Sequence, residues 1–172
     1  MSISKANDKD IPQLQKLINS AYRGDESKKG WTTEAEILGG IRIDEQTLEG
    51  YLDHEKVCIL KYCDADGAIL GSVYLEIKQP ELYLGLFAVS PSHQAKGIGK
   101  ALLKEAEAFA LANGCNRIAI TVISSRTELI AWYERHGYIA TGKSIAFEDI
   151  EGRFGEPKQE HIVLIGMEKR LA

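Results

Sequence analysis

Residues 84–114 read LGLFAVSPSHQAKGIGKALLKEAEAFALANG, and this stretch decides the fold. It begins with an apolar run, which predicts a buried strand that ends shortly before Pro91. QAKGIG at residues 94–99 then opens a segment in which apolar residues recur at helical spacing, and Gly114 is a typical helix stop. The stretch therefore predicts a strand, a tight glycine loop and a helix over Gly97–Asn113.

The glycine loop is suited to bind a pyrophosphate. The first amides of a helix have no partner within the helix, and the helix dipole adds partial positive charge there. Gly97 and Gly99 would let phosphate oxygens approach the main chain, because glycine has no Cβ. Lys96 and Lys100 add positive charge on either side of these glycines.

Two common phosphate-binding patterns do not fit this loop. A Walker A loop needs Ser or Thr after its Gly-Lys pair, but Ala101 follows Gly99-Lys100. A dinucleotide-binding loop needs a third glycine at position 102, which is Leu102. The loop alone is also compatible with a helix that simply starts at glycines.

The rest of the chain predicts an α+β protein: a mixed, mostly antiparallel sheet with helices on its faces. We expect strands at 2–6, 57–62, 68–78, 81–89, 117–122, 138–141 and 161–168, helices within 8–21, from Thr33, and at 45–52 and 126–135, and loops at 22–30 and 142–160. At 172 residues the chain is expected to form a single domain over residues 1–172.

Composition limits the location and the partners. No apolar run is long enough to cross a membrane, and the polar start MSISKANDKD favours the cytoplasm over export. The net charge of −4 argues against nucleic acid as a partner. Cys58, Cys63 and Cys115 show no metal-binding spacing, so we expect reduced, buried thiols and no metal.

Two motifs resemble those of the GNAT acyltransferase superfamily. Gln94, Gly97 and Gly99 match its coenzyme A loop, which follows a strand that ends in a valine. The family's second motif resembles residues 126–142, RTELIAWYERHGYIATG. Tyr133 stands at the position of the tyrosine in that motif. The resemblance covers most of the chain from Val57 onward, and it implies a sheet that splays at the coenzyme A site.

The resemblance also implies which residues bind acetyl-CoA and act on it. The main chain of the strand before the loop would bind the pantetheine arm and polarise the thioester carbonyl, as an oxyanion hole does. Tyr133 would give a proton to the departing thiolate, although packing against the core is its other reading. The expected acetyl-CoA contacts are Phe87, Ala88, Val89, Gln94, Ala95, Lys96, Gly97, Ile98, Gly99, Lys100 and Arg126.

The general base is the least defined part of the site. Many GNAT enzymes carry a glutamate in the middle of the strand before the loop, but this chain has Tyr83 there. Glu81, two residues upstream, is our first candidate. Glu76, Glu34 and a water chain to a distant carboxylate stay open. An amine with a pKa near 10.4 must lose its proton at a cost of about 4.6 kcal/mol at pH 7.

The acceptor pocket is expected between residues 22–36 and 142–160, with Trp31, Tyr83 and Phe154 as substrate contacts and Phe147 as a further aromatic in the second loop.

Arg126 stands where many relatives carry an asparagine. It could contact a coenzyme A phosphate or an acceptor carboxylate, or it could be a solvated arginine in the first turn of a helix.

These observations predict an N-acetyltransferase that moves acetyl from acetyl-CoA to the primary amine of a small molecule, by direct attack through a tetrahedral intermediate. A non-catalytic module that binds acyl-CoA, and a protein or peptide N-acetyltransferase, are the alternatives. The long segment 142–160 favours a small acceptor because it would cover an open peptide groove. The assembly state, monomer or homodimer, stays open.

Overall fold

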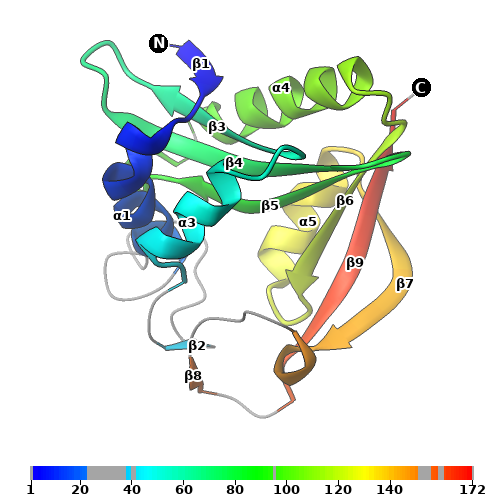
Figure 1. Ribbon diagram of the computed structural model, residues 1–172. Coiled ribbons are helices and arrows are strands. Elements are labelled where there is room, and N and C mark those ends of the chain that lie inside the picture. The colour runs from blue at the N-terminus through cyan, green and yellow to red at the C-terminus, as the bar shows by residue number, and fades with distance from the viewer. Residues whose placement is uncertain are drawn as a thin grey trace.

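A seven-stranded sheet with the order β1-β3-β4-β5-β6-β9-β7 forms the centre of the protein (Figure 1). The computed structural model describes residues 2–22, 38–39, 42–94, 96–150, 156–158 and 161–171. The strands are β1 Ser2–Lys5, β3 Val57–Cys63, β4 Ile69–Lys78, β5 Glu81–Val89, β6 Arg117–Ile123, β7 Ile139–Ala146 and β9 Val163–Arg170. The helices are α1 Ile11–Tyr22, α3 Glu45–Leu52, α4 Ile98–Ala112 and α5 Thr127–Arg135, with short 3-10 turns at Asp8–Asp10, Pro91–His93 and Phe147–Asp149. The predicted α+β class is confirmed.

The sheet is antiparallel except between β5 and β6, and there it splays. The parallel pairing joins only Glu81–Tyr83 to Arg117–Ala119. Beyond that point β6 continues to pair with β9 on its other side. The β6 side of β5 from Leu84 onward therefore carries no ladder hydrogen bonds to β6, as the predicted splay requires. We call the space between the two strands the fork.

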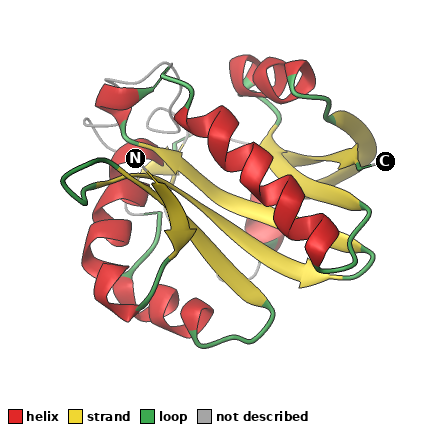
Figure 2. Cartoon of the chain, turned by 90° about the horizontal axis from the view of Figure 1, so that it is seen from above, coloured by secondary structure: helices red, strands yellow, loops and turns green. Residues whose placement is uncertain are grey.

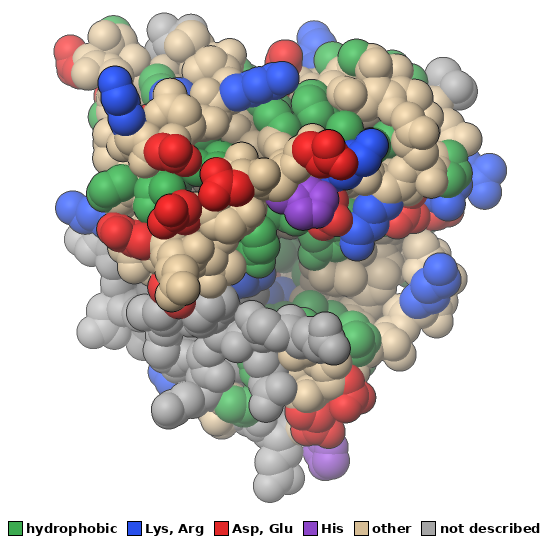
Figure 3. Space-filling view, in the orientation of Figure 1, with side chains coloured by type: hydrophobic (Ala, Val, Ile, Leu, Met, Phe, Trp, Pro, Cys, Tyr) green, Lys and Arg blue, Asp and Glu red, His purple; other side chains and the backbone are tan. Residues whose placement is uncertain are grey.

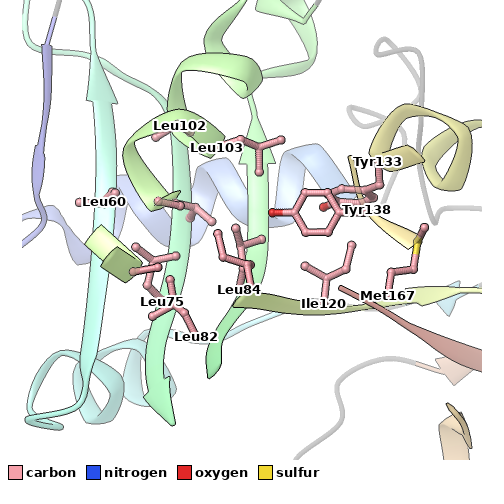
Figure 4. Close-up of a cluster of buried hydrophobic side chains, with 14 of the residues drawn as sticks. Leu60, Leu75, Leu82, Leu84, Leu102, Leu103, Ile120, Tyr133, Tyr138 and Met167 are labelled. Atoms are coloured by element: carbon pink, nitrogen blue, oxygen red, sulfur yellow. The ribbon is translucent and has the colours of Figure 1, made fainter. Parts of the chain in front are cut away.

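Helices cover both faces of the sheet (Figure 2). One core packs α1 and α3 against one face, and the other packs α4 and α5 against the opposite face. Alternate residues of a strand enter different cores, as the period of two requires: Ile59 and Tyr74 face α1, whereas Leu60, Val73 and Leu75 face α4. Figure 4 shows part of this second core.

A bulge in β5 changes this alternation next to the fork. Leu86 has a φ of 46°, and the register with β4 shifts between the pairs Tyr74↔Gly85 and Ser72↔Ala88. Bulges reorient the side chains that follow them. Phe87 is thereby directed to the α5 side, while Leu86 and Ala88 enter the α1 core. The sequence pattern did not predict this bulge.

The prediction of a loop over 142–160 was wrong in part. The strand predicted at 138–141 continues to Ala146, and its register against β9 shifts between Ala140 and Ser144, around Gly142 with its φ of 85°. Glu156–Pro157 (β8) also pairs with Leu38–Gly39 (β2). β7 is an edge strand, and most of its residues are exposed. Its sequence therefore lacks the alternation that reveals a half-buried strand.

Smaller expectations have mixed outcomes. Cys58 and Cys115 are buried free thiols, whereas Cys63 is only partly buried. The helix predicted from Thr33 lies outside the described residues. In the part of the chain that the structure describes, no helix has both the length and the apolar character needed to cross a bilayer.

Candidate active site

The glycine loop connects the end of β5 to the start of α4. Gly97 occupies the N-cap position with a left-handed φ of 83°, and a Cβ built on it would meet nothing within 4 Å. No side chain of the described residues caps this helix, so the first-turn amides of α4 face the loop. Gln94 donates a hydrogen bond from Nε2 to the Val89 carbonyl oxygen at 3.2 Å, which fixes the loop to the strand end. Ala95 lies outside the described residues.

A cavity of about 450 Å³ lies beside this loop, and we call it the loop cavity. Its walls come from the end of α1, the end of β5, the glycine loop and one face of α5. The lining residues are Ala21, Tyr22, Phe87, Val89, Gln94, Gly97, Gly99, Lys100, Arg126, Leu129, Trp132, Tyr133, Arg135 and His136. This volume is that of a small-molecule site.

The face of α5 that lines the loop cavity carries an aromatic wall. The Trp132 ring lies 5.8 Å from the Phe87 ring and 4.2 Å from the His136 ring, measured between centroids. Nδ1 of His136 is 2.7 Å from the Trp132 carbonyl oxygen. A Cβ at Gly99 would lie only 3.3 Å from Phe87, so this glycine lets the wall pack on the loop.

A second, smaller cavity of about 70 Å³ lies in the fork, and we call it the fork cavity. Figure 3 shows a hollow near the centre of the face, in the region where Figure 1 places the fork. Its described lining is Tyr22, Arg42, Tyr83, Leu84, Gly85, Leu86, Phe87, Ile120, Thr121, Val122, Ile123, Arg126, Leu129, Tyr133 and Leu164. The two cavities share five residues: Tyr22, Phe87, Arg126, Leu129 and Tyr133. The two cavities therefore adjoin along these five residues, one of which is Tyr133.

Tyr133 is only 5% exposed, and it packs edge to face against Tyr138 at a centroid distance of 5.4 Å (Figure 4). Burial raises the pKa of Tyr133 well above its ordinary value, and Tyr22 and Tyr138 act in the same direction. Arg126 has the opposite, smaller effect. The phenol is therefore protonated at neutral pH, and it is available as a proton donor to anything held between the two cavities.

Tyr83 lines the fork cavity because the residue two positions later is a glycine. A Cβ at Gly85 would lie 2.9 Å from Cε2 and 3.2 Å from the hydroxyl oxygen of Tyr83. The ring therefore lies back over Gly85, towards the fork. Tyr74 packs edge to face against this ring at 6.2 Å, and Nζ of Lys78 lies 5.4 Å from its centroid.

Arg126 is 6% exposed at the N-cap position of α5 and lines both cavities. The reading of Arg126 as a solvated arginine was wrong, because the residue is buried. Phe147 lines neither cavity: it packs with Ile123 and Ile162 in a small separate core.

The structure does not bring Glu81 to the other candidate residues. Glu81 lies at the start of β5 and pairs with Arg117, with 3.4 Å between Oε1 and Nε. It lines neither cavity, and neither does Glu76, which accepts a hydrogen bond from the Tyr74 hydroxyl at 2.8 Å. Among the other candidates, Trp31, Glu34 and Phe154 lie outside the described residues.

The predicted loop contacts have different exposures. Lys96 and Lys100 are exposed beside the loop, whereas Ile98 and Ala88 bury their side chains in the cores and can contribute only main-chain groups. No group of three metal-ligating side chains occurs among the described residues.

The sequence did not indicate Arg42 or the cavity face of α5 as parts of the site. The helical spacing of Leu129, Trp132, Tyr133 and His136 could have revealed that face, because residues three and four apart share one side of a helix. Nothing in the sequence around Arg42 indicates that it reaches a cavity.

Comparisons with known proteins agree with this arrangement. The profile described as "Acetyltransferase (GNAT) family" matches residues 11–138. A ribosomal-protein-alanine N-acetyltransferase from Brucella melitensis superposes with a TM-score of 0.73 at 18% identity, covering 99% of this chain and 100% of that one. The ribosomal-protein-S18-alanine N-acetyltransferase of Escherichia coli gives 0.72 at 17%, covering 99% and 94%. A spermidine N-acetyltransferase chimera derived in part from Vibrio cholerae gives 0.68 at 17%, covering 99% and 96%. At these identities the solved structures establish the fold and leave the acceptor undetermined.

Proposed function

The chain belongs to the GNAT acetyltransferase family, and on that premise we propose that it is an acetyl-CoA-dependent N-acetyltransferase whose acceptor is the primary amine of a small molecule. The observation that carries the proposal is that the buried Tyr133 lines both of the adjoining cavities. One cavity would hold the acyl donor and the other the amine.

The loop cavity fits coenzyme A. The uncapped amides of α4 and the open side of Gly97 leave room for pyrophosphate oxygens at the main chain of Gln94 to Lys100. The main chain of Phe87, Ala88 and Val89 follows the point at which β5 leaves β6, so groups on that side are available to the pantetheine arm. Lys96 and Lys100 would add charge near the phosphates.

The chemistry would then follow from two groups of the protein. A main-chain N–H of β5 near the fork would donate a hydrogen bond to the thioester oxygen as charge develops on it. When the amine nitrogen forms its bond to the carbonyl carbon and the C–S bond breaks, Tyr133 would transfer its proton to the departing sulfur. The proton lost by the amine would restore the phenol through solvent.

No carboxylate occurs among the described residues that line the two cavities. We therefore propose that the amine arrives in its neutral form, and we no longer assign the base to Glu81. Tyr83 would contact the acceptor from the β5 side of the fork.

Thiol release from acetyl-CoA over a panel of small amines tests the function directly. We expect turnover with at least one small amine and none with the N-terminal peptide of a ribosomal protein. Calorimetry of coenzyme A binding accompanies the assay. Tight coenzyme A binding without turnover of any acceptor would show a sensor module instead, and turnover of the peptide alone would show a protein acetyltransferase.

Replacing Gly97 with alanine is expected to raise the acetyl-CoA KM by about tenfold, because the Cβ would occupy the space of a phosphate oxygen that accepts main-chain hydrogen bonds. The φ of 83° also strains any side chain there. Gly67→Ala is the matched control: Gly67 has a φ of 84° and equally open surroundings, in the turn between β3 and β4. Equal KM values for acetyl-CoA in the two variants would refute the assignment of the glycine loop to phosphate binding.

Replacing Gly85 with alanine is expected to lower kcat/KM for the acceptor by roughly tenfold and to leave the acetyl-CoA KM unchanged, because the new Cβ displaces the Tyr83 ring from the fork. The same substitution in a Tyr83→Ala background should have almost no effect, since the ring is then absent. Losses that simply add in the double variant would show that Gly85 does not act through Tyr83.

A further inference from the structure

The described lining of the fork cavity is positively charged. The described residues that line it include Arg42 and Arg126 and no aspartate or glutamate. The two arginines enter from different sides: Arg42 lies just before α3, next to the α1 side of the sheet, and Arg126 lies between β6 and α5. A cationic acceptor such as a polyamine would meet like charge here, whereas an acid group would meet two cations.

Arg42 is held in place by its main chain. The amides of Arg42 and Ile43 both donate to Oδ1 of Asn19, at 2.7 and 3.0 Å. Nδ2 of Asn19 donates in return to the Ile43 carbonyl oxygen at 3.0 Å. Asn19 belongs to α1, so this double contact ties residue 42 to a rigid element of the fold. The position of Arg42 at the cavity is therefore built into the structure.

The guanidinium of Arg42 lies over an aromatic ring. Its Cζ lies 5.2 Å from the centroid of the Tyr22 ring, which is a cation–π contact. Among the described residues, no carboxylate lies within ion-pair distance of it. A guanidinium has five N–H donors, so a cation–π contact leaves donors available for a carboxylate.

We propose that the fork cavity binds the acid group of the acceptor, so that the substrate is a small amine carrying a carboxylate, of the amino-acid class. This inference rests on the proposed acetyltransferase function. Arg42 makes the principal contact, and Arg126 contributes charge near Tyr133. The volume of about 70 Å³ suits a group of this size. The amine, a few bonds away, then lies near the junction of the cavities.

The test compares acceptors that differ only in the acid group. Several amino acids are assayed against their carboxamides with wild type, Arg42→Gln and Arg42→Lys, and acetyl-CoA binding and thermal melting are recorded for each variant. We expect Arg42→Gln to lower kcat/KM for the acids by about tenfold to a hundredfold and to change the amides less than twofold. Because each amine serves as its own reference, differences in amine pKa cancel. Arg42→Lys should retain part of the activity.

Two controls separate the ways in which the proposal could fail. Arg170→Gln removes an arginine that is far from the cavities, with a side chain 83% exposed, and should change neither class of acceptor. Short carboxylates without an amine should inhibit wild type competitively against the acceptor, and this measurement needs no variant. Equal losses for acids and amides, or absence of this inhibition, would overturn the carboxylate subsite while leaving the acetyltransferase intact. Absence of turnover with every amine would instead overturn the proposed function.

Discussion

Tyr133→Phe is expected to lower kcat by about a hundredfold or more, which is the usual contribution of a general acid. The substitution removes one oxygen atom and keeps the ring that packs against Trp132 and Tyr138. Burial keeps the pKa of Tyr133 well above its ordinary value, so the wild-type phenol carries the proton throughout the neutral range. The acetyl-CoA KM should change little, because the loop and the aromatic wall are untouched.

Tyr138→Phe supplies a matched control for that variant. Tyr138 is 2% exposed, lies beside Tyr133 and lines neither cavity. Its hydroxyl has no hydrogen-bond partner among the described residues. Removal of a buried hydroxyl without a partner costs little or even stabilises the fold. Tyr138→Phe should therefore retain wild-type turnover and an equal or higher melting temperature.

Steady-state kinetics and melting curves of both variants decide the role of Tyr133. Normal turnover of Tyr133→Phe would return this residue to core packing, and the thiolate would then leave without help from a side chain. A loss of similar size in Tyr138→Phe would point to general disturbance of the α5 core, and the kinetic effect would say nothing about proton transfer.

Sequence patterns defined the bounds of two elements well. The expected bounds of β5 and of α3 coincide with the structure, because clear turn or loop residues flank both segments. The bulge at Leu86 was not predictable in this way. Its positive φ falls on a leucine directly after Gly85, although glycine is the residue that usually adopts such a conformation. Pairing with β4 and packing in the two cores determine where the bulge lies, and both are tertiary effects.

Residues of the candidate site that belong to local sequence motifs were predictable. Residues that distant contacts bring to the site were less so. Gly97 and Tyr133 follow from local motifs. Arg42 lines the fork cavity, and Asn19, more than twenty residues earlier, holds its main chain. No local pattern encodes such a contact. Glu81 was a reasonable base from its spacing to Tyr83. The register of β5 against β6, however, places it beside Arg117 at the closed end of the fork.

The absence of a carboxylate from the described cavity walls leads to the last prediction, which concerns pH. If the amine must arrive neutral, kcat/KM for the acceptor should rise about tenfold for each pH unit below the pKa of the amine. For an alkyl amine with a pKa near 10.4 this amounts to roughly three thousandfold between pH 6 and 9.5. Tyr133 should not oppose the rise: its pKa is raised, so its acid form persists through this range and is lost only above it.

Two acceptors whose amines differ in pKa distinguish a neutral amine supplied by solution from a base within the protein. If solution equilibrium supplies the neutral amine, the pH at which kcat/KM levels off should shift with the acceptor and match the pKa of each amine. A base within the protein would instead fix that pH at one value for both acceptors, because it belongs to the enzyme. A pre-steady-state burst measurement establishes that chemistry limits the rate. A level profile under that condition, or a common break for both amines, would mean that a base acts from outside the described lining, and the neutral-amine mechanism would be abandoned.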